Sequence, residues 1–181
     1  MAGQIIWITG LSGAGKTTLA QELNIRLRQR GSQQILLDGD MLRFLFKNTL
    51  VTSESYRREA RIKLAHKYAH LCKILSLQGF NVIISTISMF KEIYAWNRAN
   101  FPNYFEVYLK VPLEELRIRD PKEIYSSYDA GHLSDVAGLD LLIDEPSEPN
   151  LIIDFEKKPF FWESPKKITD HLLSKLEKYD C

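Results

Sequence analysis

Short apolar runs alternate along the chain with longer stretches whose apolar residues recur at three- and four-residue spacing. The short runs predict strands at residues 5–9, 35–37, 81–86, 104–109 and 151–153. Between them, residues such as Leu19, Leu23 and Leu27 share one helix face. Strands that are apolar throughout and alternate with long helices predict an α/β fold, with a mostly parallel central sheet and helices on both of its faces.

The remaining pattern predicts further helices and one irregular segment. A long helix is expected over residues 53–78, a short one over 112–119, and a closing one from Ser164 and Pro165. Residues 120–149 lack a clear period, and a segment of that length is more often a functional lid than a passive connector. We therefore expect one domain over residues 1–181, with a mobile lid at about 120–149.

Charge and composition limit the kinds of molecule that the protein is expected to bind. Lys and Arg number 24 against 23 Asp and Glu, so no bulk positive field attracts a nucleic acid polymer or an anionic membrane. No apolar run approaches the roughly 20 residues that span a bilayer. Two cysteines without disulfide or metal spacing, and a start without a basic signal region, favour a reduced cytoplasmic protein.

A phosphate-binding motif follows the first predicted strand. Residues 10–17 match G-x-x-x-x-G-K-[ST] and stand where a helix begins. In such a loop the backbone amides surround the β-phosphate, Lys16 reaches the β- and γ-oxygens, and Thr17 offers its hydroxyl to Mg²⁺. ATP and Mg²⁺ are therefore the expected cofactors, and the expected ATP-binding residues are Gly10, Ser12, Gly13, Ala14, Gly15, Lys16, Thr17 and Thr18.

The phosphate loop alone does not separate kinases from GTPases, motors or switches. A GTPase of this length would be expected to carry a base-reading N-K-x-D segment, and the sequence has none. A small-molecule kinase is therefore favoured.

A second group of polar residues follows the second predicted strand. Asp38 and Asp40 stand at the carboxyl edge of the expected sheet, where ligands bind in such folds, with Arg43 one helical turn beyond. One carboxylate can take a hydroxyl proton while the other holds Mg²⁺ through water, and the arginine can bind an acceptor phosphate. The alternative is a helix cap beside a solvated arginine.

These motifs together resemble the adenylylsulfate kinase family over nearly the whole chain. The matching segments are residues 10–18, 37–43, 87–88 and 119–122. The resemblance implies a P-loop NTPase fold and transfer of the γ-phosphoryl of ATP to the 3′-hydroxyl of a nucleotide's ribose. It makes Asp40 the candidate base, Asp38 a magnesium or water partner and Arg43 an acceptor-phosphate ligand. Lys16 of the phosphate loop is the third expected catalytic residue, because it neutralises the γ-phosphoryl together with Mg²⁺. The resemblance also implies a homodimer.

The resemblance extends to other acceptor-binding residues, each with an alternative. Ile87 and Ser88 resemble the family's Ile-Ser-Pro turn, although Met89 replaces the proline, and Ser88 could instead cap the next helix. Lys122 resembles a phosphate-binding lysine at the start of the family's lid, or is an exposed lysine in a loop. The family's acceptor-binding arginine corresponds to Arg57 by motif or to Arg61 by counting back from Ile87, and we prefer Arg57.

The departures from the family concern the acceptor's base. The family stacks adenine between two phenylalanines, whereas this chain has 136–138 Val-Ala-Gly and 50–52 Leu-Val-Thr at those places. Base stacking on an aromatic ring is worth about 1–3 kcal/mol, so a different base is expected. Residues 86–90 and 96–98 resemble a branch found with capsule-modification enzymes, which includes cytidine diphosphoramidate kinase. A cytidine diphosphate derivative such as CDP-phosphoramidate is therefore slightly favoured as the acceptor.

Two alternatives remain. The chain could be a true adenylylsulfate kinase that makes 3′-phosphoadenylylsulfate in sulfate assimilation. It could also be a non-catalytic nucleotide-binding regulator that keeps the phosphate loop, although such a regulator has no need of Asp38, Asp40, Arg43 and Lys122 together.

Overall fold

A parallel sheet forms the centre of the computed structural model, which describes residues 1–46, 58–157, 162 and 164–179. The strands are β1 (Ile5–Thr9), β2 (Gln34–Asp38), β3 (Asn81–Ser85), β4 (Tyr104–Lys110) and β5 (Leu151–Asp154). They pair in the order β2-β3-β1-β4-β5, and every pairing is parallel. The α/β fold and all the predicted strands are confirmed to within one or two residues.

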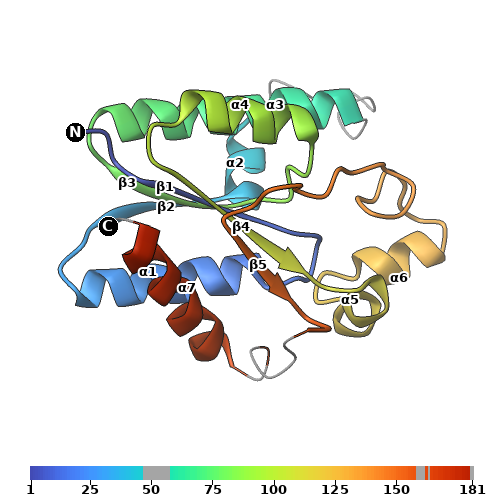
Figure 1. Cartoon of the computed structure of the whole chain (residues 1–181). Helices are drawn as coiled ribbons and strands as arrows, with labels where there is room; N and C mark the ends of the chain where they lie inside the picture. Colours follow the sequence, from blue (N-terminus) through green and yellow to red (C-terminus); the bar gives the residue numbers. More distant parts are fainter. Residues whose placement is uncertain (47–57, 158–161, 163, 180–181) are drawn as a thin grey trace.

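Helices cover both faces of the sheet (Figure 1). They are α1 (Lys16–Gln29), α2 (Gly39–Phe46), α3 (Arg58–Leu77), α4 (Lys91–Asn100), α5 (Leu113–Arg119), α6 (Ile124–Asp129) and α7 (Pro165–Tyr179). Helices α1 and α7 lie on one face, and α3 and α4 lie on the other. The predicted helices at 112–119 and after Ser164 are confirmed as α5 and α7. Of the predicted helix at 53–78, residues 53–57 lie outside the described residues.

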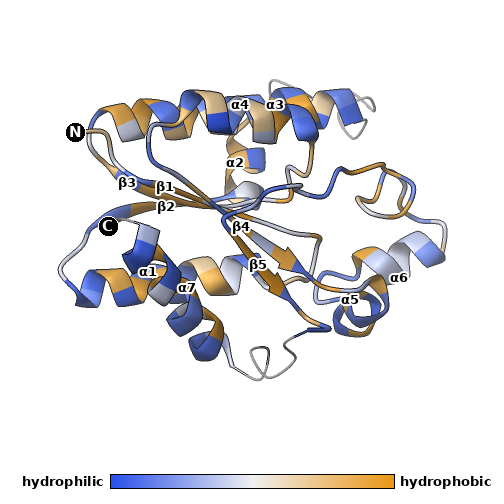
Figure 2. Cartoon of the chain, in the orientation of Figure 1, coloured by the Kyte–Doolittle hydropathy of each residue, from blue (hydrophilic) through white to orange (hydrophobic). Residues whose placement is uncertain are grey.

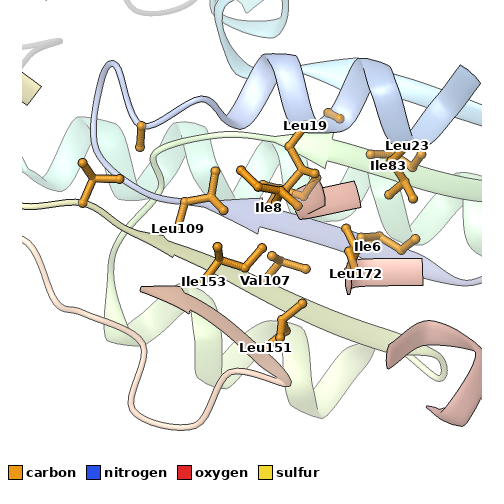
Figure 3. Close-up of a cluster of buried hydrophobic side chains, with 14 of the residues drawn as sticks. Ile6, Ile8, Leu19, Leu23, Ile83, Val107, Leu109, Leu151, Ile153 and Leu172 are labelled. Atoms are coloured by element: carbon orange, nitrogen blue, oxygen red, sulfur yellow. The ribbon is translucent and has the colours of Figure 1, made fainter. Parts of the chain in front are cut away.

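Each face of the sheet has its own buried core. Figure 3 shows the cluster beneath α1 and α7, in which Ile6, Ile8 and Val107 of the strands meet Leu19 and Leu172 of the helices. The opposite cluster includes Trp7, Ile84 and Phe90, which pack beneath α3 and α4. In Figure 2 the strands of the sheet are accordingly largely orange, whereas orange and blue residues alternate along the helices. Burial of both strand faces explains the apolar runs of the sequence.

The segment at 120–149 has more regular structure than its sequence predicts. Helix α6 lies within it, and the Asp120 carboxylate accepts hydrogen bonds from the backbone amides of Tyr125 and Ser126, at 3.1 and 2.9 Å. The expectation of a segment without clear structure was therefore wrong for its first part. A helix of this length offers too few turns for a periodic pattern to appear. The mobility of the segment stays a prediction.

The later part of the same segment is attached to the body of the protein by an arginine that also pairs with a buried carboxylate. Glu106 in β4 is fully buried at 0% exposure, and its carboxylate accepts a hydrogen bond from Arg98 of α4 at 2.6 Å. Burial raises the pKa of Glu106, and the positive charge of Arg98 opposes that rise. Arg98 also donates to the backbone oxygen of Glu148 at 2.6 Å, so one guanidinium joins helix, sheet and loop.

We expect Arg98→Met to lower the free energy of unfolding by about 3 kcal/mol, because it removes the cation that compensates the charge of a buried carboxylate. Urea denaturation measures the change. The double variant Arg98→Met/Glu106→Gln should recover most of the loss. If the double variant is as unstable as the single one, the loss comes from the contact with Glu148 rather than from the unpaired charge.

Candidate functional site

A cavity of about 590 Å³ opens at the carboxyl ends of β1, β2 and β3. In parallel strands these ends meet at one edge, which is where residues from separate motifs come together. Of the residues predicted from the sequence, those that line the cavity are Ser12, Gly13, Gly15, Lys16, Thr17, Thr18, Asp38, Asp40, Arg43, Ile87 and Lys122. Gly10 and Ala14 shape the loop from beneath, since Ala14 is fully buried and a Cβ on Gly10 would meet the Leu109 backbone oxygen at 2.7 Å.

The phosphate loop joins β1 to the start of α1. Gly13 and Gly15 have φ of 75° and 89°, a left-handed backbone that favours glycine, and Gly15 is the residue before the first helical turn. The backbone amides at the start of α1 therefore face the cavity without an intrahelical partner, as anion binding requires. The Lys16 amine donates to the Leu11 backbone oxygen of the same loop at 2.7 Å.

The environment of Lys16 makes it sensitive to pH. Burial, followed by the neighbouring charge of Lys122, lowers the pKa of Lys16 to about 8, although Asp40 and Asp38 act in the opposite direction. A bound polyphosphate adds negative charge beside the amine and raises this pKa again. Binding of ATP should therefore take up a proton at pH values above 8.

We expect the affinity for ATP to be constant below about pH 8 and to fall by up to about tenfold per pH unit above it. The sign follows because free Lys16 loses its proton in that range, while only the protonated amine binds the phosphates well. Isothermal titration calorimetry between pH 6.5 and 9.5 measures it. Lys16→Arg serves as the control, since a guanidinium stays protonated and the profile should flatten. An unchanged profile in that variant would assign the pH dependence to another group.

Asp38 is held in place by several hydrogen bonds. Its carboxylate accepts from the Thr17 and Ser85 hydroxyls, both at 2.8 Å, and from the Asp40 amide at 2.9 Å. Partial burial alone would raise the pKa of Asp38, but these hydrogen bonds and one from the Met41 amide keep it below its ordinary value. Asp38 is therefore ionised at neutral pH, beside the Thr17 hydroxyl.

These oxygens fit a magnesium ion that is shared with phosphates. Mg²⁺ prefers oxygen ligands and usually keeps several waters, so one hydroxyl and one carboxylate suffice when a nucleotide supplies the rest. Among the described residues, no group of three or more His, Cys, Asp or Glu side chains could hold a metal ion unaided. His66 and His70, four apart on α3, instead contact the ring of Trp96.

Asp40 lies in the first turn of α2 and lines the same cavity as the phosphate loop. Its carboxylate forms an ion pair with Lys122, which lies 82 residues later in the chain, just after α5. Both side chains are more than half exposed, at 61% and 52%. Arg43, one helical turn beyond Asp40, lines the same cavity. The helix-cap alternative holds in part, because the Asp38 carboxylate accepts a hydrogen bond from the Asp40 amide at the start of this helix.

A smaller pocket adjoins the main cavity. It is lined by Arg43, Arg61, Leu64, Tyr68, Thr86, Ile87, Ser88 and Phe90. Arg61 projects into it from α3, whereas Arg57 lies outside the described residues. Phe90 is buried and packs in the core at 2% exposure.

The turn at Ile87 and Ser88 is tightly fixed. The Thr9 hydroxyl donates to the Ile87 backbone oxygen at 2.5 Å, and Ser88 has a positive φ of 26°. The Ser88 hydroxyl lies 2.8 Å from the Thr86 hydroxyl. The N-cap position of α4 is occupied by Phe90, whose side chain makes no capping hydrogen bond. The alternative in which Ser88 caps the next helix is therefore wrong.

The structure also brings together residues to which the sequence assigned no role. The Arg119 guanidinium lies 5.2 Å from the ring centroids of both Phe155 and Trp162, and a Cβ on Gly15 would lie 3.9 Å from the Trp162 ring. Such a set of stacking groups beside the phosphate loop can take a flat base. In the sequence, the only sign of a base-stacking role was that Phe155 and Trp162 follow the last predicted strand.

The 136–138 segment lies against the phosphate loop. Val136 and Ala137 are buried, at 7% and 6% exposure, and a Cβ on Gly138 would meet Leu11 at 2.9 Å. The Tyr125 hydroxyl donates to the Ser12 backbone oxygen at 2.9 Å. The segment after α5 therefore contacts the phosphate loop at two places. The 50–52 segment lies outside the described residues.

Comparison with known proteins agrees with this site. A family model described as adenylylsulphate kinase matches residues 2–154. The cytidine diphosphoramidate kinase of Campylobacter jejuni subsp. jejuni serotype O:2 is 41% identical over 150 residues, which cover 83% of this chain and 85% of that protein. The adenylyl-sulfate kinase of Pseudomonas aeruginosa is 36% identical over 152 residues, covering 83% and 76%.

A solved structure extends the likeness to three dimensions. The Mycobacterium tuberculosis APS kinase CysC, in complex with AMPPNP and APS, superimposes with a TM-score of 0.85 at 28% identity, covering 97% of this chain and 98% of that one. The alternative of a non-catalytic regulator is set aside by these matches to kinases. The chain therefore belongs to the adenylylsulphate kinase family, and it is an ATP-dependent phosphotransferase with an alcohol group as acceptor.

Proposed function

We propose that this kinase transfers the γ-phosphoryl of ATP to the ribose 3′-hydroxyl of a nucleotide, and that the nucleotide is a cytidine diphosphate derivative such as CDP-phosphoramidate. The main support is that one cavity joins the phosphate loop, through Lys16 and Thr17, to Asp40 and Arg43. A phosphate donor and a phosphorylated alcohol can therefore be held face to face in that cavity.

On the donor side, the amides of the phosphate loop and the Lys16 amine bind the β- and γ-phosphates. Gly10, Ser12, Gly13, Ala14, Gly15, Thr17 and Thr18 complete the binding loop. Thr17 and Asp38 would hold Mg²⁺, which supplies positive charge to the phosphate oxygens when bound. The base of ATP stacks against Arg119 and its aromatic neighbours, Phe155 and Trp162.

On the acceptor side, the 3′-oxygen of the ribose bonds to the γ-phosphorus while Asp40 accepts the proton of that hydroxyl. The bond from that phosphorus to the β-γ bridging oxygen breaks, and ADP leaves. Lys122 leaves its ion pair with Asp40 and binds the γ-phosphoryl during transfer. The Asp40 carboxylate is then free to accept the proton. Asp38 assists by keeping its neighbour Asp40 in place through the amide hydrogen bond.

The acceptor's phosphates bind Arg43 and an arginine of α3. Arg61 lines the acceptor-side pocket together with Ile87 and Ser88, so we now favour it over Arg57 for this role. The relative named cytidine diphosphoramidate kinase supports the cytidine acceptor. The buried Val136 and Ala137 support it further, because they offer no aromatic ring on which an adenine can stack.

The protein's setting is part of the same proposal. We expect a homodimer made of single-domain subunits in the cytoplasm, with residues 120–149 acting as the lid. Light scattering after gel filtration measures the oligomeric state. Among the described residues, no helix is both long and apolar enough to cross a membrane.

The test is an ADP-release assay with CDP-phosphoramidate and adenylylsulfate as competing acceptors. We expect kcat/KM to be at least about tenfold higher for the cytidine compound, which equals the loss of roughly one stacking contact for adenine. A reaction without acceptor corrects for ATP hydrolysis. A higher kcat/KM for adenylylsulfate would instead identify a true adenylylsulfate kinase, and no turnover of either compound would refute the proposed function.

A further inference from the structure

A tight loop at residues 135–141 is organised around one carboxylate. Asp140 accepts hydrogen bonds from two consecutive backbone amides, that of Asp135 at 2.8 Å and that of Val136 at 2.7 Å. Asp135 has φ of 57°, a left-handed backbone that costs free energy for a residue other than glycine. The two hydrogen bonds to Asp140 offset that cost, so the shape of the loop depends on this side chain.

The loop is connected to the acceptor side of the site. The Asp135 backbone oxygen accepts a hydrogen bond from the Arg61 guanidinium at 2.6 Å, across 74 residues of sequence. Arg61 in turn lines the acceptor-side pocket with Arg43 and Ser88. The orange stretch that follows α6 in Figure 1 contains this loop.

We propose that Asp140 is a positioning residue for acceptor binding. Its carboxylate fixes the turn that presents the Asp135 carbonyl to Arg61, and this carbonyl holds the Arg61 guanidinium at the acceptor pocket. Asp140 lies on the exposed surface of the loop and does not line the cavity, so it acts through Arg61. The inference rests on the proposed function, because it requires Arg61 to bind the acceptor.

The physical basis is preorganisation of a long side chain. An arginine that is already held in its binding conformation loses less rotamer entropy when an anion binds. Without Asp140, the Asp135 turn relaxes and its carbonyl no longer orients the guanidinium. Acceptor affinity should then fall. We expect kcat and the KM for ATP to stay nearly unchanged, because the loop meets the phosphate loop through the packing of Gly138 on Leu11, whereas the hydrogen bonds of Asp140 go to Asp135 and Val136.

The test compares acceptor KM in Asp140→Ala with that of the wild type. We expect an increase of about 5- to 20-fold, with a smaller increase in Asp140→Asn, since an amide oxygen can replace only part of the carboxylate. Asp129→Ala is the matched control. It removes another exposed carboxylate of the same segment, which pairs with Arg117, and it should leave acceptor KM unchanged.

A double variant separates positioning from a general loss of structure. In an Arg61→Ala background, Asp140→Ala should cause no further rise in acceptor KM, because the residue it acts through is gone. An equal rise in both backgrounds would overturn the proposal. A fall in kcat with no change in acceptor KM would also overturn it.

Amide hydrogen exchange tests the loop without any acceptor. The Asp135 and Val136 amides should exchange faster in Asp140→Ala than in Asp129→Ala. Equal exchange would overturn the role of Asp140 even if the kinase activity is as proposed. A wild-type enzyme that turns over neither acceptor would instead refute the proposed function, which these variants do not measure.

Discussion

Replacing Asp40 with asparagine should lower kcat by about 10²–10⁴-fold while the affinity for ATP stays nearly unchanged. The reason is that an amide keeps the size of the side chain but cannot take the proton of the acceptor hydroxyl. The Lys16 amine donates to the Leu11 backbone oxygen of its own loop, and Asp40 affects its pKa less than burial and Lys122 do. Steady-state kinetics with saturating acceptor, together with calorimetry of ATP binding, measure both quantities.

Asp170→Asn is the control for this substitution. It makes the same chemical change on α7, where Asp170 pairs with Arg26 far from the cavity, and should leave kcat unaltered. Turnover of Asp40→Asn within about tenfold of the wild type would remove Asp40 from the role of base.

Replacing Lys16 with alanine should lower kcat/KM for ATP by about 10³-fold or more. The amine is the half-buried cation of the phosphate loop, and its charge acts on the phosphates in surroundings that weaken charge interactions less than water does. The melting temperature should not fall. Because burial lowers the pKa of Lys16 to about 8, the folded state is penalised for holding this charge at pH 7, and the variant removes that penalty.

The matched control is Lys166→Ala, which removes an exposed lysine at the start of α7 and should change neither quantity. The opposite pattern, with normal kcat/KM in Lys16→Ala and its loss in Lys122→Ala, would mean that Lys122 is the cation that binds the phosphates.

Features that depend on short-range pattern could be predicted from the sequence. The strands are apolar on both faces, and the phosphate loop combines a fixed spacing of Gly10, Gly15 and Lys16 with a strand before it and a helix after it. Each of these patterns spans about ten residues or fewer, so the strands and the phosphate loop can be predicted from neighbouring residues alone. The placement of Asp38 and Asp40 at the sheet edge followed from the same reasoning.

Contacts between distant residues could not be predicted in this way. Nothing local in the sequence pairs Lys122 with Asp40 or Arg61 with the Asp135 carbonyl, since such contacts depend on how the segment after α5 folds back over the sheet. The stacking of Arg119 on Trp162 has the same origin. A helical turn after Asp40 was expected, but the exposure of the apolar residues of α2 was not. These residues recur at helical spacing, and such a pattern ordinarily predicts a buried face.

The most direct test is a crystal structure with a non-hydrolysable ATP analogue and CDP-phosphoramidate bound together. We predict that the γ-phosphate analogue lies against Lys16 and that the ribose 3′-oxygen lies within hydrogen-bond distance of the Asp40 carboxylate, directly or through one water. A 3′-oxygen beyond the reach of Asp40 even through one water, or a different hydroxyl facing the γ-phosphate, would contradict the proposed chemistry.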